Sequence, residues 1–248
     1  MGDYFTKDWK GAPFELFGTA HLMGLVIVAL CISAIAYFGR KASPGRRRWM
    51  RYGLAIVLVV VETSWHLWNV FTGQWTIQTM LPLHLCSALV WLSVVMLVTR
   101  NYTIYEFAYL LGIIGALQAL LTPDAGIYGF PHFRFFQVLA SHGAIIAAAV
   151  FMTVVEKFRP TKDSVVRVGV RGNVYMAIVF VLNFLIGSNY LFIAHKPETA
   201  SLLDVLPPWP WYIGIIELLG LFFILLFYSP FALKDWKAKR LNDAVSAS

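Results

Sequence analysis

Long apolar stretches recur along almost the whole chain and limit it to very few folds. Seven of them are long enough to cross about 30 Å of hydrocarbon, which takes roughly 20 residues at about 1.5 Å each. They cover residues 19–38, 52–71, 81–98, 105–121, 135–155, 172–194 and 210–228. A lipid-facing barrel would need alternating apolar and polar residues, which these stretches lack. We therefore predict an all-α polytopic membrane bundle with seven transmembrane helices.

The composition agrees with a chain embedded in a membrane. Of the 248 residues, 59% are hydrophobic and 13% are charged, whereas soluble domains average about 25% charged residues. The apolar stretches follow one another too closely for a linker, so we expect a single integral membrane domain over residues 1–248, with its core at about 14–230. Cys31 and Cys86 form no CxxC motif, which argues against a disulfide scaffold or a zinc finger.

The net charge of +7 indicates orientation in a membrane and no nucleic-acid partner, because the basic residues lie between the apolar spans and at the C-terminus. With the N-terminus outside, sixteen of the 20 Lys and Arg residues face the cytoplasm, and only Lys7, Lys10, Arg134 and Lys196 face out. This is a strong positive-inside bias. We expect the N-terminus outside and the C-terminus in the cytoplasm, in a bacterial cytoplasmic membrane.

Polar side chains within the spans gather in the outer half of the predicted bundle. Counted from the outer boundaries, Cys86, His66 and Asn189 lie about 7 Å deep, His142 about 10 Å and Glu62 about 14 Å. His21, Gln118 and Glu217 fall in the same half, and Asn183 lies nearer the middle. Such groups cost free energy inside a membrane unless they meet partners or a cavity. Their shared depth predicts one polar cavity that opens outward.

Glu62 and His66 are four residues apart in the second span, so they share one helix face. The carboxylate can then hold the imidazole. Two interpretations stay open: a structural pair that fills the bundle interior, or a pair that contributes to the cavity. We count both residues, together with His84, as candidates for substrate binding.

The segment LPLHLC carries the candidate nucleophile. Pro82 suits the first turn of a helix, in which His84 and Cys86 would lie on nearly opposite faces. A partner for Cys86 must then come from another helix, and His142 in the segment ASHG lies within about 3 Å of the same predicted depth. A thiol beside an imidazole attacks an ester carbonyl and forms a thioester that a second hydroxyl cleaves, with the imidazole carrying the protons.

Cys86 and His142 are therefore the predicted catalytic pair. The alternative is that Cys86 is a small buried hydrophobic residue, as most cysteines in membrane helices are. Cys31 serves as the internal comparison, because it lies about 11 Å deeper than Cys86 and far from the predicted polar layer.

The segments LPLHLC, ASHG and NYLFIAHKPETASLLDVLPPWPWY together resemble the YwaF and transmembrane protein 164 family over nearly all of the apolar core. The resemblance implies a seven-helix membrane protein whose animal member is an acyltransferase. That member remodels ether phosphatidylethanolamines with polyunsaturated chains through a cysteine and a histidine, which fall here at Cys86 and His142. The family is also distantly similar to androgen-induced membrane hydrolases, which use a Thr and a His. Pro207 and Pro208 stand where we expect a glycine.

In the segment NYLFIAHKPETASLLDVLPPWPWY, which we expect on the outer side, a cation and several aromatic residues lie where a lipid headgroup and an aromatic belt would be. Interface anchoring accounts for the aromatic residues. Lys196 beside an acyl-transfer cavity would instead hold a phosphate, with Asp204 or Asn189 positioning an ethanolamine or glycerol group. The candidates for substrate binding in this segment are Asn189, Lys196, Asp204, Trp209, Trp211 and Tyr212.

We expect a phospholipid acyltransferase or transacylase, with lipid esterase side activity, that acts on phospholipids and lysophospholipids without a cofactor or metal. A transacylase is favoured because acyl-coenzyme A is a large cytoplasmic donor, whereas the reactive groups open toward the outer leaflet. One competing class is a proton-coupled transporter or lipid-binding receptor with Glu62, His66, His84 and His142 as a relay. Another is a zinc-dependent membrane hydrolase. The oligomeric state is not predicted.

Overall fold

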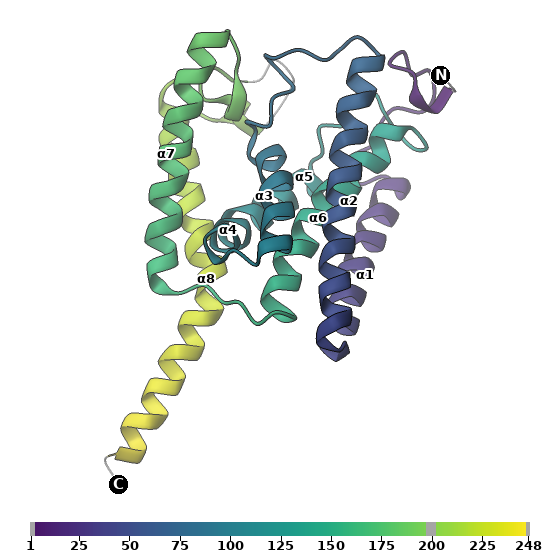
Figure 1. The fold of residues 1–248 in the computed structure, drawn as a ribbon. Coiled ribbons are helices and arrows are strands. Elements are labelled where there is room, and N and C mark those ends of the chain that lie inside the picture. The colour runs from purple at the N-terminus through teal and green to yellow at the C-terminus, as the bar shows by residue number, and fades with distance from the viewer. Residues whose placement is uncertain (1–2, 197–201, 247–248) are drawn as a thin grey trace.

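The chain forms a bundle of helices in a computed structural model, which describes residues 3–196 and 202–246 (Figure 1). The long helices are α1 (Thr19–Lys41), α2 (Pro44–Phe71), α6 (Phe133–Val154), α7 (Lys162–Ile186) and α8 (Trp211–Ser246). The shorter ones are α3 (Leu85–Thr99), α4 (Tyr102–Phe107) and α5 (Ile113–Leu121), with a π-helical turn, Ala108–Gly112, between the last two. No strand occurs in the described ranges, which confirms the all-α prediction.

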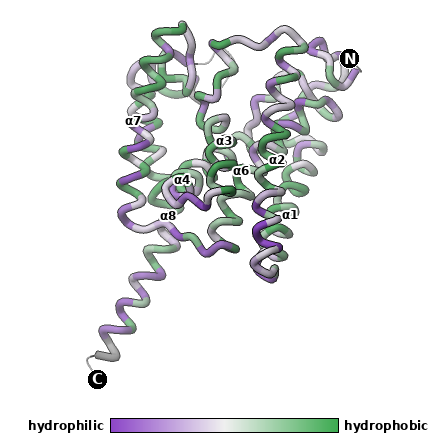
Figure 2. The backbone as a smooth tube through the Cα atoms, in the orientation of Figure 1, coloured by the Kyte–Doolittle hydropathy of each residue, from purple (hydrophilic) through white to green (hydrophobic). Residues whose placement is uncertain are grey.

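Within residues 3–196 and 202–246, six helical rods are long and apolar enough to cross a membrane, with α4 and α5 counted as one rod, Tyr102–Leu121. The third predicted span corresponds to α3, which is apolar but has only 15 residues. Figure 2 shows apolar residues along the rods and hydrophilic residues on the part of α8 that projects from the bundle. The chain is thus a multi-pass membrane protein by length and composition, and its orientation stays a prediction.

Helix α6 forms the centre of the bundle and packs against α1, α2, α3 and α5. Its small buried residues, among them Gly143, Ala144 and Ala147, let the neighbouring helices approach closely. A Cβ added to Gly143 would lie 2.9 Å from Cγ1 of Val28 in α1. The crossing of α1 and α6 therefore depends on a glycine at this position.

Helices α7 and α8 stand on the side of the bundle away from α1 and α2 (Figure 1). A buried carboxylate ties α7 to α4 near one end. Glu106 accepts a hydrogen bond of 2.6 Å from the hydroxyl of Ser164 and forms ion pairs with Arg167 and Arg171. This clamp fixes the N-terminal part of α7. The C-terminal part of α7 is held by contacts with the loop that follows it.

The buried amide of Asn183 holds the loop after α7 against the bundle. Helix α7 ends at Gly187, whose φ of 64° lies in the left-handed region that glycine adopts readily. Asn183, 2% exposed, donates from Nδ2 to the Tyr190 carbonyl (2.9 Å) and accepts from the Tyr190 amide and the Ser188 hydroxyl (both 2.8 Å). The Tyr190 hydroxyl in turn donates to the Ile77 carbonyl at 2.7 Å. Residues 190–193 are thereby held against the loop that precedes α3.

The third span was predicted to begin at residue 81, and this is wrong. Helix α3 begins at Leu85, because Leu81 precedes a proline and disfavours helical geometry, and the Leu83 amide bonds back to the Leu81 carbonyl at 2.7 Å. Pro82 therefore lies in the turn before the helix and not in its first turn.

The sixth span, predicted at 172–194, is also misplaced, because α7 runs over Lys162–Ile186. Thr161 starts this helix, and its amide donates to the Ser164 hydroxyl at 2.8 Å. Asn189 lies beyond the end of α7, so the depth predicted for it is wrong. Arg167 and Arg171, which were counted as loop charges, lie on the helix itself.

The N-terminal segment folds over the C-terminal end of α2 and the N-terminal end of α6. The Trp68 indole donates to the Phe5 carbonyl at 2.8 Å, and Nε2 of His132 donates to the Thr6 carbonyl at 3.0 Å. His132 is the N-cap of α6, and its Nδ1 accepts the Arg134 amide at 3.0 Å. Burial lowers the pKa of His132 despite its bond to Thr6.

Candidate functional site

The thiol of Cys86 lies at a helix terminus inside the bundle. It belongs to the second residue of α3, with His84 as the N-cap. In Figure 1 the upper end of α3 lies well below the upper ends of α2 and α7. In the described residues, the backbone N–H groups of Leu85, Cys86 and Ser87 have no hydrogen-bond partner. The thiol therefore sits beside free donors, where the helix dipole is positive.

A cavity of about 690 Å³ lies between α3 and α5 on one side and α7 and α8 on the other. Cys86 lines this cavity, and its Sγ lies 4.0 Å from the position that a Cβ on Gly115 in α5 would take. The polar side chains of the wall belong to His84, Gln118, Thr122, Asp124, Asn173, Tyr175 and Glu217. The rest of the wall is apolar, so the cavity suits a ligand with long hydrocarbon parts and few polar atoms.

His84 lines the same cavity as Cys86, which corrects the prediction that the two side chains face opposite ways. That prediction assumed that both residues were helical, but His84 is an N-cap with extended backbone. Its Nδ1 accepts the amide of Leu191 at 3.3 Å, and its ring packs against Tyr190 and Phe192. In the neutral ring the proton is then on Nε2, so His84 offers a hydrogen-bond donor.

His142 lies on the face of α6 that is turned toward the α4–α5 rod. Thr153, eleven residues or about three turns further on, shares this face and contacts the Tyr105 hydroxyl at 3.0 Å. Nδ1 of His142 donates to the Val138 carbonyl at 2.7 Å, which leaves the electron pair of the neutral ring on Nε2.

The predicted pair is not directly bonded. Among the residues that the structure describes, no hydrogen bond joins His142 to Cys86, and His142 is not part of the wall of the cavity. Their helices α3 and α6 do pack against each other. The pair therefore stays a prediction in which the two groups approach from neighbouring helices.

Glu62 and His66 share one face of α2, with Oε1 and Nε2 3.7 Å apart. Trp75 fixes the imidazole, because its indole N–H donates to Nδ1 of His66 at 3.0 Å. The neutral ring then directs its Nε2–H at the carboxylate. Glu62 is 3% exposed and lies within electrostatic range of Cys86. This geometry fits both interpretations of the pair.

Arg134 was missed as a site residue, because the sequence shows it only as one of a few outward charges. Its guanidinium lies 3.9 Å from the ring centroid of Trp65 and donates to the side chain of Gln137 and, at 3.0 Å, to the Asp124 carbonyl. It also lies within electrostatic range of Glu62. The sequence did offer one indication of this residue, because Arg134 is a single cation directly before an apolar span.

A second polar pair lies on the α7–α8 wall of the cavity. Nδ2 of Asn173 donates to Oε2 of Glu217 and to the Gly169 carbonyl, both at 3.0 Å. Asn173 was missed because the misplaced sixth span put it at the inner boundary. The cap formed by Thr161 and Ser164 would have placed it correctly, near the middle of α7.

The residues predicted to bind a headgroup lie in the connection between α7 and α8 and at the start of α8. Asn189 uses its whole amide within the loop, bonding the backbone of Ala194 and His195. Lys196 donates to the Leu206 carbonyl at 2.7 Å. Trp209 and Tyr212 donate to the carbonyls of Ile193 and Phe192, and Trp211 and Asp204 are exposed. The phosphate role of Lys196 stays a prediction, and residues 197–201 of the motif lie outside the described residues.

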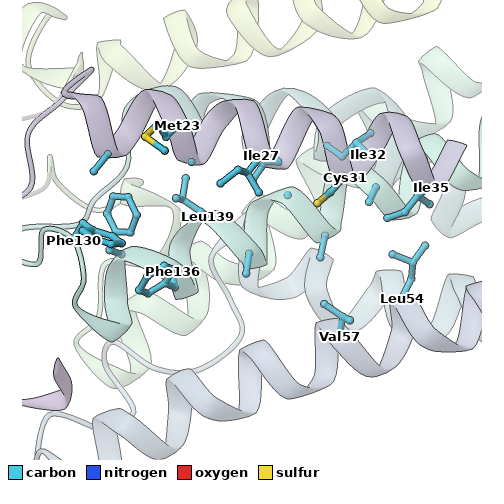
Figure 3. Close-up of a pocket in the computed structure, with 18 of the residues that line it drawn as sticks. Met23, Ile27, Cys31, Ile32, Ile35, Leu54, Val57, Phe130, Phe136 and Leu139 are labelled. Atoms are coloured by element: carbon cyan, nitrogen blue, oxygen red, sulfur yellow. The ribbon is translucent and has the colours of Figure 1, made fainter. Parts of the chain in front are cut away.

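Cys31 lies in different surroundings. It lines an apolar groove of about 800 Å³ between α1, α2 and α6, where Figure 3 shows it among Ile27, Ile32 and Leu139. No imidazole, amide or carboxylate of the described residues lines this groove. Cys31 is thus a suitable comparison for the reactivity of Cys86.

The two competing classes stay predictions. In the described ranges no three His, Cys, Asp or Glu side chains converge as zinc ligands would. His66, His84 and His142 bond to Trp75, Leu191 and Val138 respectively, so they do not form a hydrogen-bonded chain with one another. A proton relay would need such a chain across the bundle.

The fold and the site define a polytopic helical membrane protein with a largely apolar cavity between helices, which bears a thiol at the start of a short helix. A model of the TMEM164 family matches residues 16–228, so the chain belongs to the TMEM164 family. The family predicted from LPLHLC and ASHG is confirmed. No curated protein and no solved structure matches the chain.

Proposed function

We propose that the protein is a phospholipid acyltransferase that moves acyl chains between lipids through a thioester on Cys86. The observation that carries the proposal is the position of this thiol. It lines a cavity of about 690 Å³ that is largely apolar, and it stands beside free backbone N–H groups at the start of α3.

The first step forms the thioester. The sulfur of Cys86 attacks the ester carbonyl of a donor phospholipid, and the carbonyl oxygen gains negative charge. In the proposal, the free N–H groups of Cys86 and Ser87 stabilise this oxyanion, and one such donor is worth about 10²–10³ in rate. The donor leaves as a lysophospholipid.

His142 accepts the thiol proton in this proposal. Its Nε2 carries the free electron pair, because Nδ1 is held by the Val138 carbonyl. Catalytic hydrogen bonds are often long before substrate binds, or run through one water molecule. The contact between α3 and α6 keeps the two residues on neighbouring helices.

The second step transfers the chain to a lysophospholipid acceptor. A lipid donor suits the site better than acyl-coenzyme A, because the cavity is walled by the apolar helices α3, α5, α7 and α8. The active site faces the outer leaflet in the predicted orientation. His84, Glu62 and His66 belong to the proposed substrate site, with Lys196 at its outer rim.

The test is detection of the acyl-enzyme. Purified protein incubated with a radiolabelled or alkyne-labelled phospholipid should carry a hydroxylamine-sensitive label on Cys86. Cys86→Ala should lose this label, and Cys31→Ala, the matched control in the apolar groove, should keep it. Equal labelling of the Cys86→Ala protein refutes the nucleophile. His142→Ala should slow mild alkylation of Cys86, and an unchanged alkylation rate removes His142 as the base.

A further inference from the structure

The wall of the cavity that faces α3 carries a carboxylate with one oxygen still free to bind. Glu217 lies about 9 Å from the start of α8, well inside the span. Its Oε2 accepts a hydrogen bond of 3.0 Å from Asn173. In the described ranges Oε1 has no hydrogen bond, and no cationic side chain forms an ion pair with this carboxylate.

The orientation of this carboxylate is fixed by its partner. Both amide hydrogens of Asn173 are used, one by the Gly169 carbonyl of the preceding turn and one by Glu217. The carboxylate is thus held against α7 while the pair lines the cavity. An ionisable group inside a membrane-spanning helix is costly and marks a functional site by default.

The proposed reaction needs proton transfer at two different places. One proton leaves and returns to the sulfur, and another is exchanged with the oxygen of the lipid. His142 does not line the cavity, whereas Glu217 does. Glu217 is therefore better placed to meet the oxygen of a lipid that fills the cavity.

We infer that Glu217 is the acid and base that serves the substrate oxygen, while His142 serves the thiol. This inference rests on the proposed function. In the first step, the thiol proton passes to His142 and the S–C bond forms. The ester C–O bond breaks, and the acid form of Glu217 gives its proton to the leaving oxygen. The acyl-enzyme then holds a protonated His142 and an ionised Glu217.

The second step reverses these transfers with a new alcohol. The acceptor hydroxyl gives its proton to Glu217, and its oxygen forms the new ester bond. The C–S bond breaks, and the thiolate recovers its proton from His142. No oxidant or other co-reactant is needed, and each group returns to its starting state.

The alternative role of Glu217 is a purely structural tie between α7 and α8. Glu217→Gln separates the two roles, because the amide oxygen of glutamine still accepts the bond from Asn173 but cannot take up a proton. Glu217→Asp keeps a proton-accepting group on a shorter side chain. Glu15→Gln, on the exposed segment before α1, is the matched control.

The experiment separates loading from transfer. Each protein is first loaded with a p-nitrophenyl ester of a fatty acid, whose leaving group needs no added proton. The acyl-enzyme is then discharged either with a lysophospholipid or with neutral hydroxylamine, which needs no base. We expect Glu217→Gln to load and to react with hydroxylamine as the wild type does, but to transfer to the lysophospholipid about 100-fold more slowly, a typical effect of losing a general base.

The remaining outcomes are equally decisive. Glu217→Asp should restore transfer at least tenfold over Glu217→Gln, and Glu15→Gln should match the wild type. Equal transfer by Glu217→Gln and the wild type overturns the inference while the proposed function stands. Failure of Glu217→Gln to load identifies a structural tie and also overturns it. Failure of the wild type to load at Cys86 refutes the proposed function and the inference with it.

Discussion

Replacing Asn183 by alanine should destabilise the protein strongly, because this one amide satisfies several buried groups. The change removes both partners of the Tyr190 backbone and the acceptor of the Ser188 hydroxyl, in a region where Tyr190 is 0% exposed. Each buried polar group left without a partner costs about 1–3 kcal/mol. With partial relaxation we expect a loss of about 3 kcal/mol in the free energy of unfolding, in line with these costs.

That loss is large enough to measure in detergent by intrinsic tryptophan fluorescence. For a chain of this size, about 1 kcal/mol corresponds to about 2–4 °C in Tm, so Asn183→Ala should lower Tm by about 6–12 °C. Asn101→Ala is the control, since Asn101 caps α4 through a single exposed bond of 3.0 Å to the Ile104 amide. Loss of such a cap costs about 1 kcal/mol.

The same variant tests the connection to the cavity. The segment that Asn183 holds through Tyr190 continues into the cavity wall beside His84, which includes Leu191, Phe192 and Ile193. Loosening this segment should therefore speed alkylation of Cys86 and leave that of Cys31 unchanged. A fall in Tm no larger than that of Asn101→Ala, or equal changes at both cysteines, would show that this buried amide does not organise the wall.

Two further predictions concern the packing of the bundle and the start of α6. Gly143→Leu should separate α1 from α6 through a clash with Val28 and cost about 1–3 kcal/mol, seen as a lower Tm, while Gly169→Ala, in open space within α7, should not lower Tm, because alanine favours the helix. The lowered pKa of His132 predicts full stability above about pH 6.5 and a loss as the pH falls, because the buried neutral ring must become charged. His132→Asn keeps an N-cap without this titration, so its Tm should fall less between pH 7.5 and pH 5.5; equal falls would contradict the argument.

The sequence predicts the rods well, because hydrophobic burial in a bilayer depends on length and composition alone. It predicts poorly where a helix starts for local reasons. The apolar residues of LPLHL predict part of a membrane span, yet the backbone turns at Pro82 and the helix begins only at Leu85. Conversely, Arg167 and Arg171 lower the hydropathy of the first part of α7, so the predicted span began after them. Their ion pairs with Glu106 explain why these charges are tolerated within the helix.

The candidate site shows the same division. Cys86, His142 and Glu62 stand out because polar groups inside spans are rare, and this signal needs no knowledge of packing. The grouping of Cys86 with Glu217 and Asn173 around one cavity depends on how α7 and α8 lean against α3 and α5. Periodicity within single helices carries no information about that arrangement.

The shortness of α3 has a consequence for the surrounding bilayer. Its 15 residues rise only about 22 Å, which is about 8 Å short of the average hydrocarbon thickness. Such mismatch is relieved by local thinning of the membrane. We expect a dimple beside α3 that draws lipid glycerol groups toward the midplane, so that their ester bonds reach the depth of the thiol without leaving the leaflet.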